Sequence, residues 1–276
     1  LEKLLLQLSR AKKQQIVVIS YFQLLSQKKP IKAKVLATKS KVSSAIIKAL
    51  VEKNIFEFYY IKTDRISFDD NTKNLKVLNP FQEQAFRQIK ESMDTNHVTL
   101  FHGITSSGKT EVYTKLIQET IDSGKQVLFL LPEIALTTQI IVRLQDYFGN
   151  NISVFHSKYT MNERVEVWNN LLESKEKAQI VLGARSSIFL PFKKLGLIVV
   201  DEEHETSYKQ FEPTPRYNAR DASIVLSKLH DAKIILGSAT PSLESFFNAK
   251  EKKYGFVSLN RRHGDVKMPI IELIDL

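Results

Sequence analysis

Short apolar runs alternate with amphipathic segments from residue 97 onward. Six runs are typical of strands and lie at residues 97–101, 126–131, 152–156, 179–183, 196–200 and 233–237. Helical spacing of apolar residues fills four of the gaps, at 110–122, 135–148, 160–173 and 218–230. Strands that alternate with helices form parallel sheets, and strands that are apolar throughout are buried on both faces. The pattern therefore predicts an α/β domain whose parallel sheet is covered by helices on both faces.

The N-terminal part of the chain has a different pattern. Apolar residues recur at helical spacing in three segments, 1–25, 32–38 and 42–53. Either Ser43 or Ser44 is the expected N-cap of the third helix. Residues 56–62 are rich in aromatic side chains and favour a short strand. Three short helices and a β element are typical of a winged-helix domain, although many small basic helical domains share this pattern. We expect this domain over 1–65, a linker over 66–80 and the α/β domain over 81–276.

A phosphate-binding motif follows the first apolar run. Residues 103–110 read Gly-Ile-Thr-Ser-Ser-Gly-Lys-Thr, the G-x-x-x-x-G-K-T pattern of P-loop nucleotide-binding proteins. Glycines allow a tight turn whose backbone N–H groups point at a phosphate, and the helix that follows adds its positive end. Lys109 is expected to reach the outer phosphates, and the Thr110 hydroxyl is expected to bind Mg²⁺. The predicted nucleotide-binding residues here are Gly103, Thr105, Ser106, Ser107, Gly108, Lys109 and Thr110.

An acidic pair, Asp201 and Glu202, follows the apolar run 196–200. Ligands of parallel α/β sheets bind outside the carboxyl ends of the strands, which is where this pair is expected. Asp201 would hold Mg²⁺, directly or through water, and Glu202 would orient and deprotonate the attacking water. The other interpretation, a solvated strand end, is weakened by the P-loop upstream. We take Lys109, Asp201 and Glu202 as the candidate catalytic residues.

Two further groups of residues suggest contacts beyond the nucleotide. Gly237, Ser238 and Thr240 follow another strand, and small hydroxyl residues there suit a coupling role. The segment 204–220 places aromatic residues among cations, a composition that suits stacking on unpaired bases. The candidate DNA-binding residues are Arg185, Tyr208, Lys209, Arg216, Tyr217 and Arg220. Ordinary loop residues, and aromatics that anchor the loop on its own domain, are the alternative.

Charge is distributed unevenly along the chain. Residues 1–65 carry 14 Lys and Arg against 4 Asp and Glu, whereas the other residues carry 26 of each. Such an excess suits contact with a nucleic-acid backbone, and a solvated basic surface is the simpler alternative.

The 276 residues include no cysteine, which excludes disulfides and cysteine-ligated zinc within them. We find no apolar run of membrane-spanning length and no signal peptide, and expect a soluble, cytoplasmic protein without membrane contact. Both ends look cut, so we expect a partial chain.

Several motifs together carry a resemblance to one family. GITSSGKTEVY, LPEIALTTQ, GARSSIFLPFKKLGLIVVDEEH, PRYNARD and LGSATPSLES are similar, in this order, to the N-terminal helicase lobe of the PriA family, the bacterial primosomal replication-restart DNA helicases. SRAKKQ and AIIKALVEK resemble that family's winged-helix domain.

The resemblance implies a RecA-like lobe and an ATP-dependent, Mg²⁺-dependent DNA helicase that unwinds 3′ to 5′ at stalled or forked DNA. It also implies primosome and single-strand-binding proteins as partners. Gln82 would read the adenine, while His204 and the segment Gly237–Thr240 would couple nucleotide state to DNA.

The departures from the family also shape the expectation. The family's 3′-end-binding domain, second helicase lobe and cysteine-rich zinc insertion have no counterpart in these residues. We therefore expect weak nucleotide binding and poor hydrolysis from this chain alone.

Two alternative functions remain. One is an RNA helicase or chromatin-type translocase, and the other is a non-catalytic DNA-binding regulator with a nucleotide switch. Glu202 argues against the switch, because a pure switch does not need a residue that activates water.

Overall fold

The computed structural model describes residues 4–5, 8–25, 31, 33–58, 72–132, 138–156 and 159–261. The chain divides into two compact units, Leu1–Thr63 and Asp64–Leu276. The predicted domain limits at residues 65 and 80 stay predictions.

The described part of the first unit consists mainly of helices joined by turns. Its helices are α2 (Lys12–Leu25), α3 (Ala33–Ser40) and α4 (Ser44–Glu52). Their apolar faces meet in a small core that contains Val17, Leu36 and Leu50. Ser43 is the N-cap of α4, with extended backbone. Of the strand expected over 56–62, residues 56–58 have no regular structure, and the rest lies outside the described residues.

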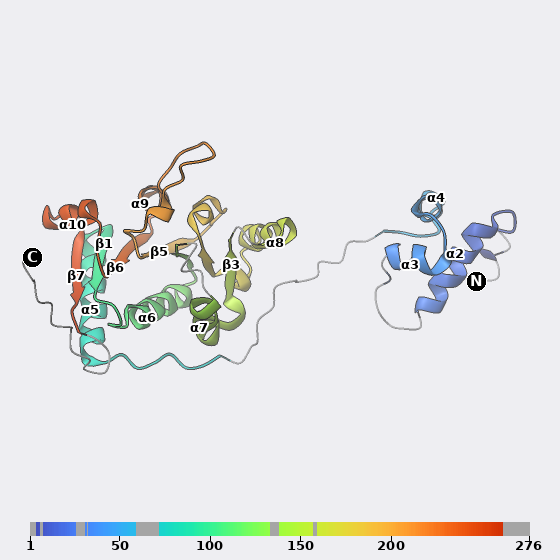
Figure 1. Ribbon diagram of the computed structural model, residues 1–276. Helices are drawn as coiled ribbons and strands as arrows, with labels where there is room; N and C mark the ends of the chain where they lie inside the picture. Colours follow the sequence, from blue (N-terminus) through green and yellow to red (C-terminus); the bar gives the residue numbers. More distant parts are fainter. Residues whose placement is uncertain are drawn as a thin grey trace, which may run out of the picture. The chain divides into compact units, whose positions relative to one another are not determined.

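The second unit is built on a sheet of seven parallel strands (Figure 1). The strands are β1 (Val98–Gly103), β2 (Gln126–Leu130), β3 (Ile152–Phe155), β4 (Ile180–Gly183), β5 (Leu195–Asp201), β6 (Lys233–Ser238) and β7 (Gly255–Leu259). Their order is β3-β4-β2-β5-β6-β1-β7, so the ends of β5, β6 and β1 are neighbours. This order places the P-loop after β1 and the acidic pair at the end of β5, at the same carboxyl-terminal end of the parallel strands.

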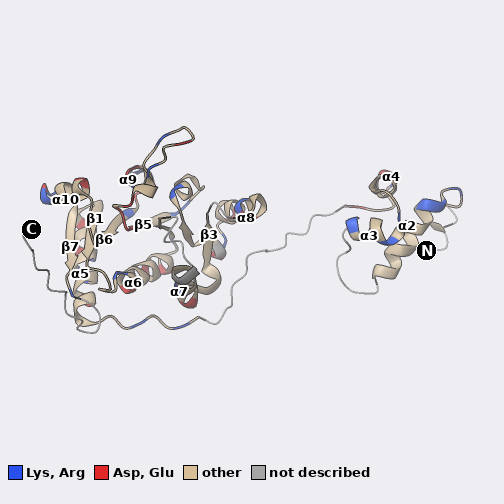
Figure 2. Cartoon of the chain, in the orientation of Figure 1, with Lys and Arg blue, Asp and Glu red and all other residues tan. Residues whose placement is uncertain are grey.

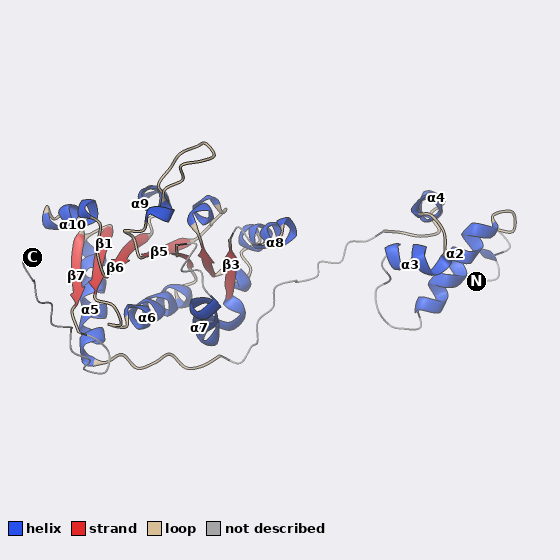
Figure 3. Ribbon diagram, in the orientation of Figure 1, coloured by secondary structure: helices blue, strands red, loops and turns tan. Residues whose placement is uncertain are grey.

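Helices cover both faces of this sheet (Figure 3). They are α5 (Pro80–Thr95), α6 (Lys109–Asp122), α7 (Thr138–Phe148), α8 (Met161–Leu172), α9 (Ala219–Leu229) and α10 (Leu243–Lys250). Short 3₁₀ helices η1 to η4 lie at Gly149–Asn151, Glu176–Ala178, Arg185–Phe189 and Thr206–Tyr208. One apolar cluster joins α5, α6 and α7 to the sheet, and a second joins α8, α9 and α10 to the opposite face.

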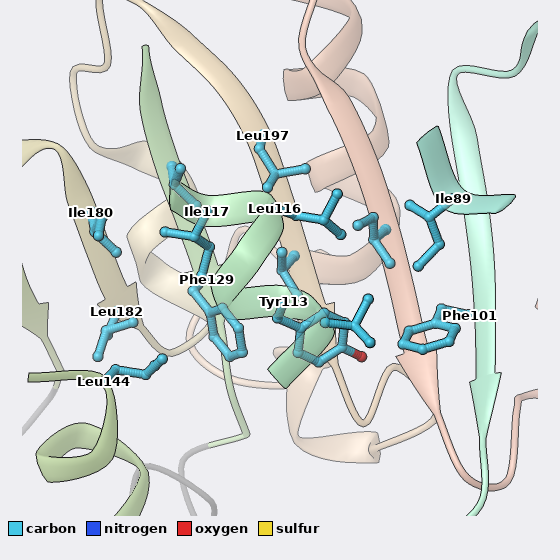
Figure 4. Close-up of a cluster of buried hydrophobic side chains, with 14 of the residues drawn as sticks. Ile89, Phe101, Tyr113, Leu116, Ile117, Phe129, Leu144, Ile180, Leu182 and Leu197 are labelled. Atoms are coloured by element: carbon cyan, nitrogen blue, oxygen red, sulfur yellow. The ribbon is translucent and has the colours of Figure 1, made fainter. Parts of the chain in front are cut away.

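Successive side chains of each strand point to opposite faces of the sheet and therefore belong to different clusters. Phe101 and Phe129 belong to the cluster under α6, while their neighbours Leu100 and Leu128 belong to the other cluster. Figure 4 shows Phe101, Tyr113 and Phe129 together in the first cluster. The predicted α/β fold with a doubly covered parallel sheet is confirmed. None of the helices in the described ranges combines the length and the apolar character that a membrane span needs.

Candidate nucleotide-binding site

A cavity of about 480 Å³ lies over the P-loop. β1 ends at Gly103 and α6 begins at Lys109, so the loop runs directly from strand to helix. Ser106 and Gly108 adopt positive φ angles, 64° and 86°, which turn the chain tightly above the helix. The cavity is lined by the loop and by residues from four other segments, namely Lys76, Val77, Gln82, Ile104, Thr105, Ser106, Ser107, Gly108, Lys109, Thr110, Glu111, Arg143, Asp201 and Glu202.

Lys109 lies between the loop and the acidic turn. Its ammonium group donates a hydrogen bond of 2.9 Å to the Gly103 carbonyl and lies 3.9 Å from Oε1 of Glu202. A Cβ on Gly103 would come within 2.7 Å of Cγ of Lys109, so this glycine makes room for the lysine stem. The Ser107 hydroxyl is buried and has no hydrogen-bond partner among the described residues. An unpaired donor beside a cation and a helix N-terminus fits an anion such as a phosphate.

Asp201 ends β5 at the wall of the cavity. Tyr113 donates a hydrogen bond of 3.2 Å to its Oδ1, and Tyr208 donates one of 2.7 Å to its carbonyl oxygen. Burial, followed by the charge of Glu202, raises the pKa of Asp201 from 3.8 to about 6. A nearby cation would favour the ionised carboxylate, so the position suits a metal ligand. Glu202 has a positive φ of 48°, so the chain turns sharply as it leaves the strand.

Gln82 is built into the P-loop. Asn79 and Gln82 form a capping box at the start of α5, in which Oε1 of Gln82 accepts a bond of 3.0 Å from the Asn79 backbone. Nε2 of Gln82 donates a bond of 3.2 Å to the Ser107 carbonyl. Only 3% of Gln82 is exposed. A residue that faces the cavity is thus tied both to a helix start and to the phosphate-binding loop.

Besides Ile104 inside the P-loop, four cavity residues were missed from the sequence. Lys76 and Val77 come from the extended segment before α5, Glu111 from the first turn of α6, and Arg143 from α7. Arg143 forms an ion pair with Glu111, and Lys76 lies 4.0 Å from the same carboxylate. Glu111 lies inside the segment GITSSGKTEVY, and the other three belong to no motif. The charge of Arg143 on a helix whose other face is apolar was the one available signal.

The expected coupling residues lie together beside this cavity. Nδ1 of His204 is 2.8 Å from the Ser238 hydroxyl, which also accepts a bond of 2.9 Å from the Thr240 backbone. The Gly237 carbonyl accepts a bond of 3.0 Å from the backbone of Glu203. The turn after β5 is therefore bonded to the segment after β6.

The candidate DNA-binding residues fall into two groups. Arg216 is exposed and Lys209 and Tyr217 are partly exposed, in the loop that extends from the domain before α9 (Figure 1). Arg185 instead donates to the carbonyls of Ser207 and Lys209, both at 3.3 Å, and so holds the base of this loop.

Tyr208 and Arg220 have structural partners as well. The expectation that Tyr208 stacks on bases conflicts with its burial, since 1% is exposed and its hydroxyl also donates to the Leu130 carbonyl at 3.1 Å. Arg220 likewise pairs with the buried Glu203 at 3.1 Å rather than facing solvent. Burial was not visible in the local sequence, where both residues sit in a polar, aromatic-rich segment.

The other charged feature is the first unit. Its described helices carry Lys12, Lys13, Lys34, Lys39 and Lys48 against the single carboxylate of Glu52 (Figure 2).

Across the described ranges, no group of three or more His, Asp or Glu side chains could hold a metal ion by itself. A site completed by Thr110, Asp201 and phosphate oxygens does not need such a group.

Comparison with known proteins agrees with this geometry. Residues 79–247 match the DEAD/DEAH box helicase family, and residues 1–63 match the winged-helix domain of PriA helicases of Bacteroidota. The chain is 37% identical to the replication restart protein PriA of Bacillus subtilis, over 98% of this chain and 34% of the relative. It is 46% identical to that of Rickettsia felis, over 75% of this chain and 31% of the relative. The chain thus spans about a third of the length of these relatives.

A solved structure supports the fold. RecG bound to a three-way DNA junction superposes with a TM-score of 0.52 and 19% identity, covering 92% of this chain and 30% of that one. At this identity the likeness concerns the fold alone.

Proposed function

The chain belongs to the DEAD/DEAH box helicases and, within them, to the PriA type of replication restart protein, and on this premise we propose that it forms part of an ATP-dependent 3′-to-5′ DNA helicase that restarts replication at stalled or forked DNA. The observation that carries the proposal is one cavity lined by both Lys109 of the P-loop and the acidic pair Asp201 and Glu202. This combination suits nucleotide hydrolysis, because a pure binding site needs no residue beside the phosphates to activate water.

The P-loop residues hold the phosphates. Backbone N–H groups of the loop and the N-terminus of α6 bind phosphate oxygens, Lys109 neutralises the outer phosphates, and the Ser107 hydroxyl supplies a donor. The Thr110 hydroxyl and the Asp201 carboxylate would hold Mg²⁺. When MgATP is bound, ATP supplies the phosphoanhydride bond that is cleaved, and Mg²⁺ neutralises part of the negative charge that develops on the phosphates. Glu202 orients the attacking water and accepts its proton. Gln82 recognises the adenine, and its bond to Ser107 links the base to the phosphate-binding loop.

DNA is the proposed macromolecular partner. The exposed part of the loop 204–220, with Arg216 and Tyr217, would contact single-stranded DNA, and the basic first unit would contact the phosphate backbone of a fork. His204, Gly237, Ser238 and Thr240 would couple the two sites, since they join the turns after β5 and β6. Primosome and single-strand-binding proteins are the proposed protein partners, and the bacterial cytoplasm is the proposed location. A zinc site is not proposed for these residues, which contain no cysteine.

The test separates a motor from a nucleotide switch. In the full-length protein, Glu202→Gln should abolish ATP turnover while binding of a fluorescent ATP analogue is kept, because the amide cannot take up the proton. A variant that still turns over ATP at the wild-type rate would refute this role. Matched DNA and RNA forks should differ in how strongly they stimulate the wild type, with DNA the stronger. Residues 1–276 by themselves should hydrolyse ATP poorly, because they span only about a third of the length of the relatives that they match.

A further inference from the structure

Glu203 lies between the two residues that the function uses, Glu202 and His204, yet it does not line the cavity over the P-loop. Its side chain is completely buried. Its carboxylate accepts four hydrogen bonds, from the Ser242 backbone at 2.6 Å, the Ser242 hydroxyl at 3.0 Å, the Ser245 hydroxyl at 2.8 Å and the Arg220 guanidinium at 3.1 Å. An ionised carboxylate that is buried without such partners is costly, so this pairing stabilises the charged form of Glu203.

These donors come from two separate segments of the chain. Ser242 is the N-cap of α10, directly after the segment Gly237–Thr240, and Ser245 lies in that helix's first turn. Arg220 lies in the first turn of α9, where the chain leaves the exposed loop. Arg220 also donates to the Ser242 hydroxyl at 2.8 Å, so the two segments are bonded to each other as well as to Glu203.

The Glu203 backbone adds a third connection. Its N–H donates a bond of 3.0 Å to the Gly237 carbonyl at the end of β6. Glu202 precedes it in a strained backbone conformation, with a φ of 48°, so the placement of the Glu202 carboxylate depends on how firmly the next residue is held. A shift of α9 or α10 would therefore move the anchor of the turn that carries Glu202.

We infer that Glu203 is a positioning residue that joins the loop before α9 and the start of α10 to the hydrolytic turn, so that DNA on the loop stimulates ATP hydrolysis through it. The inference rests on the proposed function. It assigns Arg220 to this network instead of to direct DNA contact, and it explains why a carboxylate with no access to the nucleotide lies beside Glu202.

The test compares Glu203→Gln with Glu205→Gln in the full-length protein. Both remove one carboxylate charge from the same turn, but Glu205 is only partly buried and lies outside the network. For each variant we would measure basal and DNA-stimulated ATP turnover, DNA affinity, ATP-analogue affinity and the thermal midpoint. We expect Glu203→Gln to lower the ratio of stimulated to basal turnover about ten-fold, while both affinities stay within about two-fold of wild type. Glu205→Gln should keep the wild-type ratio.

Three results would overturn the inference: an unchanged ratio in Glu203→Gln, an equal loss in Glu205→Gln, or a parallel fall of basal and stimulated turnover together with the thermal midpoint. Ser245→Ala covers the case in which Glu203→Gln does not fold, because it removes one bond and leaves the charge pair intact. It should lower the same ratio, and full stimulation in that variant would also count against the inference. Wild-type protein without any DNA stimulation would instead refute the proposed function.

Discussion

The hydroxyl of Tyr113 donates a hydrogen bond of 3.2 Å to Oδ1 of Asp201, joining the helix after the P-loop to the strand that carries the acidic pair. The Tyr113 ring is completely buried and meets Phe101 and Phe129 edge-on (Figure 4). A Cβ on Gly237 would lie 1.7 Å from this hydroxyl, so β6, the strand beside β5, has to carry glycine there. The P-loop helix and the acidic turn are thus held together even without phosphate.

Tyr113→Phe should raise the pKa of Asp201 further above its value of about 6, because burial and the Glu202 charge already raise it and the tyrosine hydrogen bond opposes them. Asp201 must be ionised to hold Mg²⁺, so the acidic limb of the turnover profile should move to higher pH. The measurement is turnover against pH, with the partly exposed Tyr147→Phe as control. A limb that moves to lower pH, or moves equally in the control, would contradict the assignment.

Asp201→Asn should stabilise the Mg²⁺-free protein at neutral pH. The folded-state pKa of about 6 exceeds the ordinary value of 3.8, so folding favours the protonated carboxyl. This contribution is complete below the ordinary value and is lost as the pH rises through about 6. Denaturant titrations at pH 7.5 and near pH 4 measure the difference between the variants. The variant should be the more stable protein at pH 7.5, and the gap should close near pH 4. A variant less stable than wild type at pH 7.5 would show that the ionised carboxylate is favourably bound.

Gly108→Ala should abolish nucleotide binding, because a Cβ there would lie 2.2 Å from Nε2 of Gln82 in a backbone with a φ of 86°. Gly124→Ala is a matched control, since Gly124 has a φ of 74° and a Cβ there meets no atom within 4 Å. The control should lose about 1–2 kcal/mol of stability from the left-handed backbone alone and keep nucleotide binding. ATP-analogue titration and thermal unfolding separate the two effects. Equal binding by both alanine variants would remove the proposed role of the Gln82 contact.

Tyr208→Phe should destabilise the domain without weakening DNA binding. Its buried hydroxyl donates hydrogen bonds to the carbonyls of Leu130 and Asp201, and leaving such acceptors unpaired costs about 1–3 kcal/mol.

Tyr217→Ala, in the exposed loop, should weaken binding of single-stranded DNA, because base stacking contributes about 1–3 kcal/mol per base. Chemical denaturation and fluorescence anisotropy with a labelled oligonucleotide check both. Weaker DNA binding by Tyr208→Phe without a loss of stability would instead place its hydroxyl in contact with DNA. Unchanged binding by Tyr217→Ala would assign Tyr217 to packing against Phe189, whose ring centroid lies 5.0 Å away.

The sequence predicts the sheet well wherever a strand is buried on both faces. Apart from Gln126 in β2 and Gly196 and Asp201 in β5, both strands consist of apolar residues, and their predicted limits agree closely with the structure. β7 was missed because it is an edge strand whose residues alternate between buried and exposed, so it contains no continuous apolar run. α10 was missed because it has eight residues and its start was taken only as part of a motif.

The candidate site was predictable where a motif fixes the local backbone. The P-loop and the acidic pair needed only that two strands end at the same edge of one sheet. Tyr208 and Arg220 were assigned to DNA because their neighbours are aromatic and cationic. The burial of Tyr208 depends on β2, which is distant in the sequence, and that of Arg220 depends on the start of α10, which was not predicted. Arg143 reaches the cavity only through the packing of α7, so composition could not identify it.

The central claim, that this cavity hydrolyses ATP in response to DNA, is tested most directly by ATP turnover of the full-length protein with and without forked DNA, beside Lys109→Ala. We predict that forked DNA stimulates turnover strongly and that Lys109→Ala abolishes it, because the lysine ammonium is the cation placed between the P-loop and Glu202. Turnover that is absent, indifferent to DNA or kept in Lys109→Ala would contradict the account, and the basic first unit would then become the main functional element.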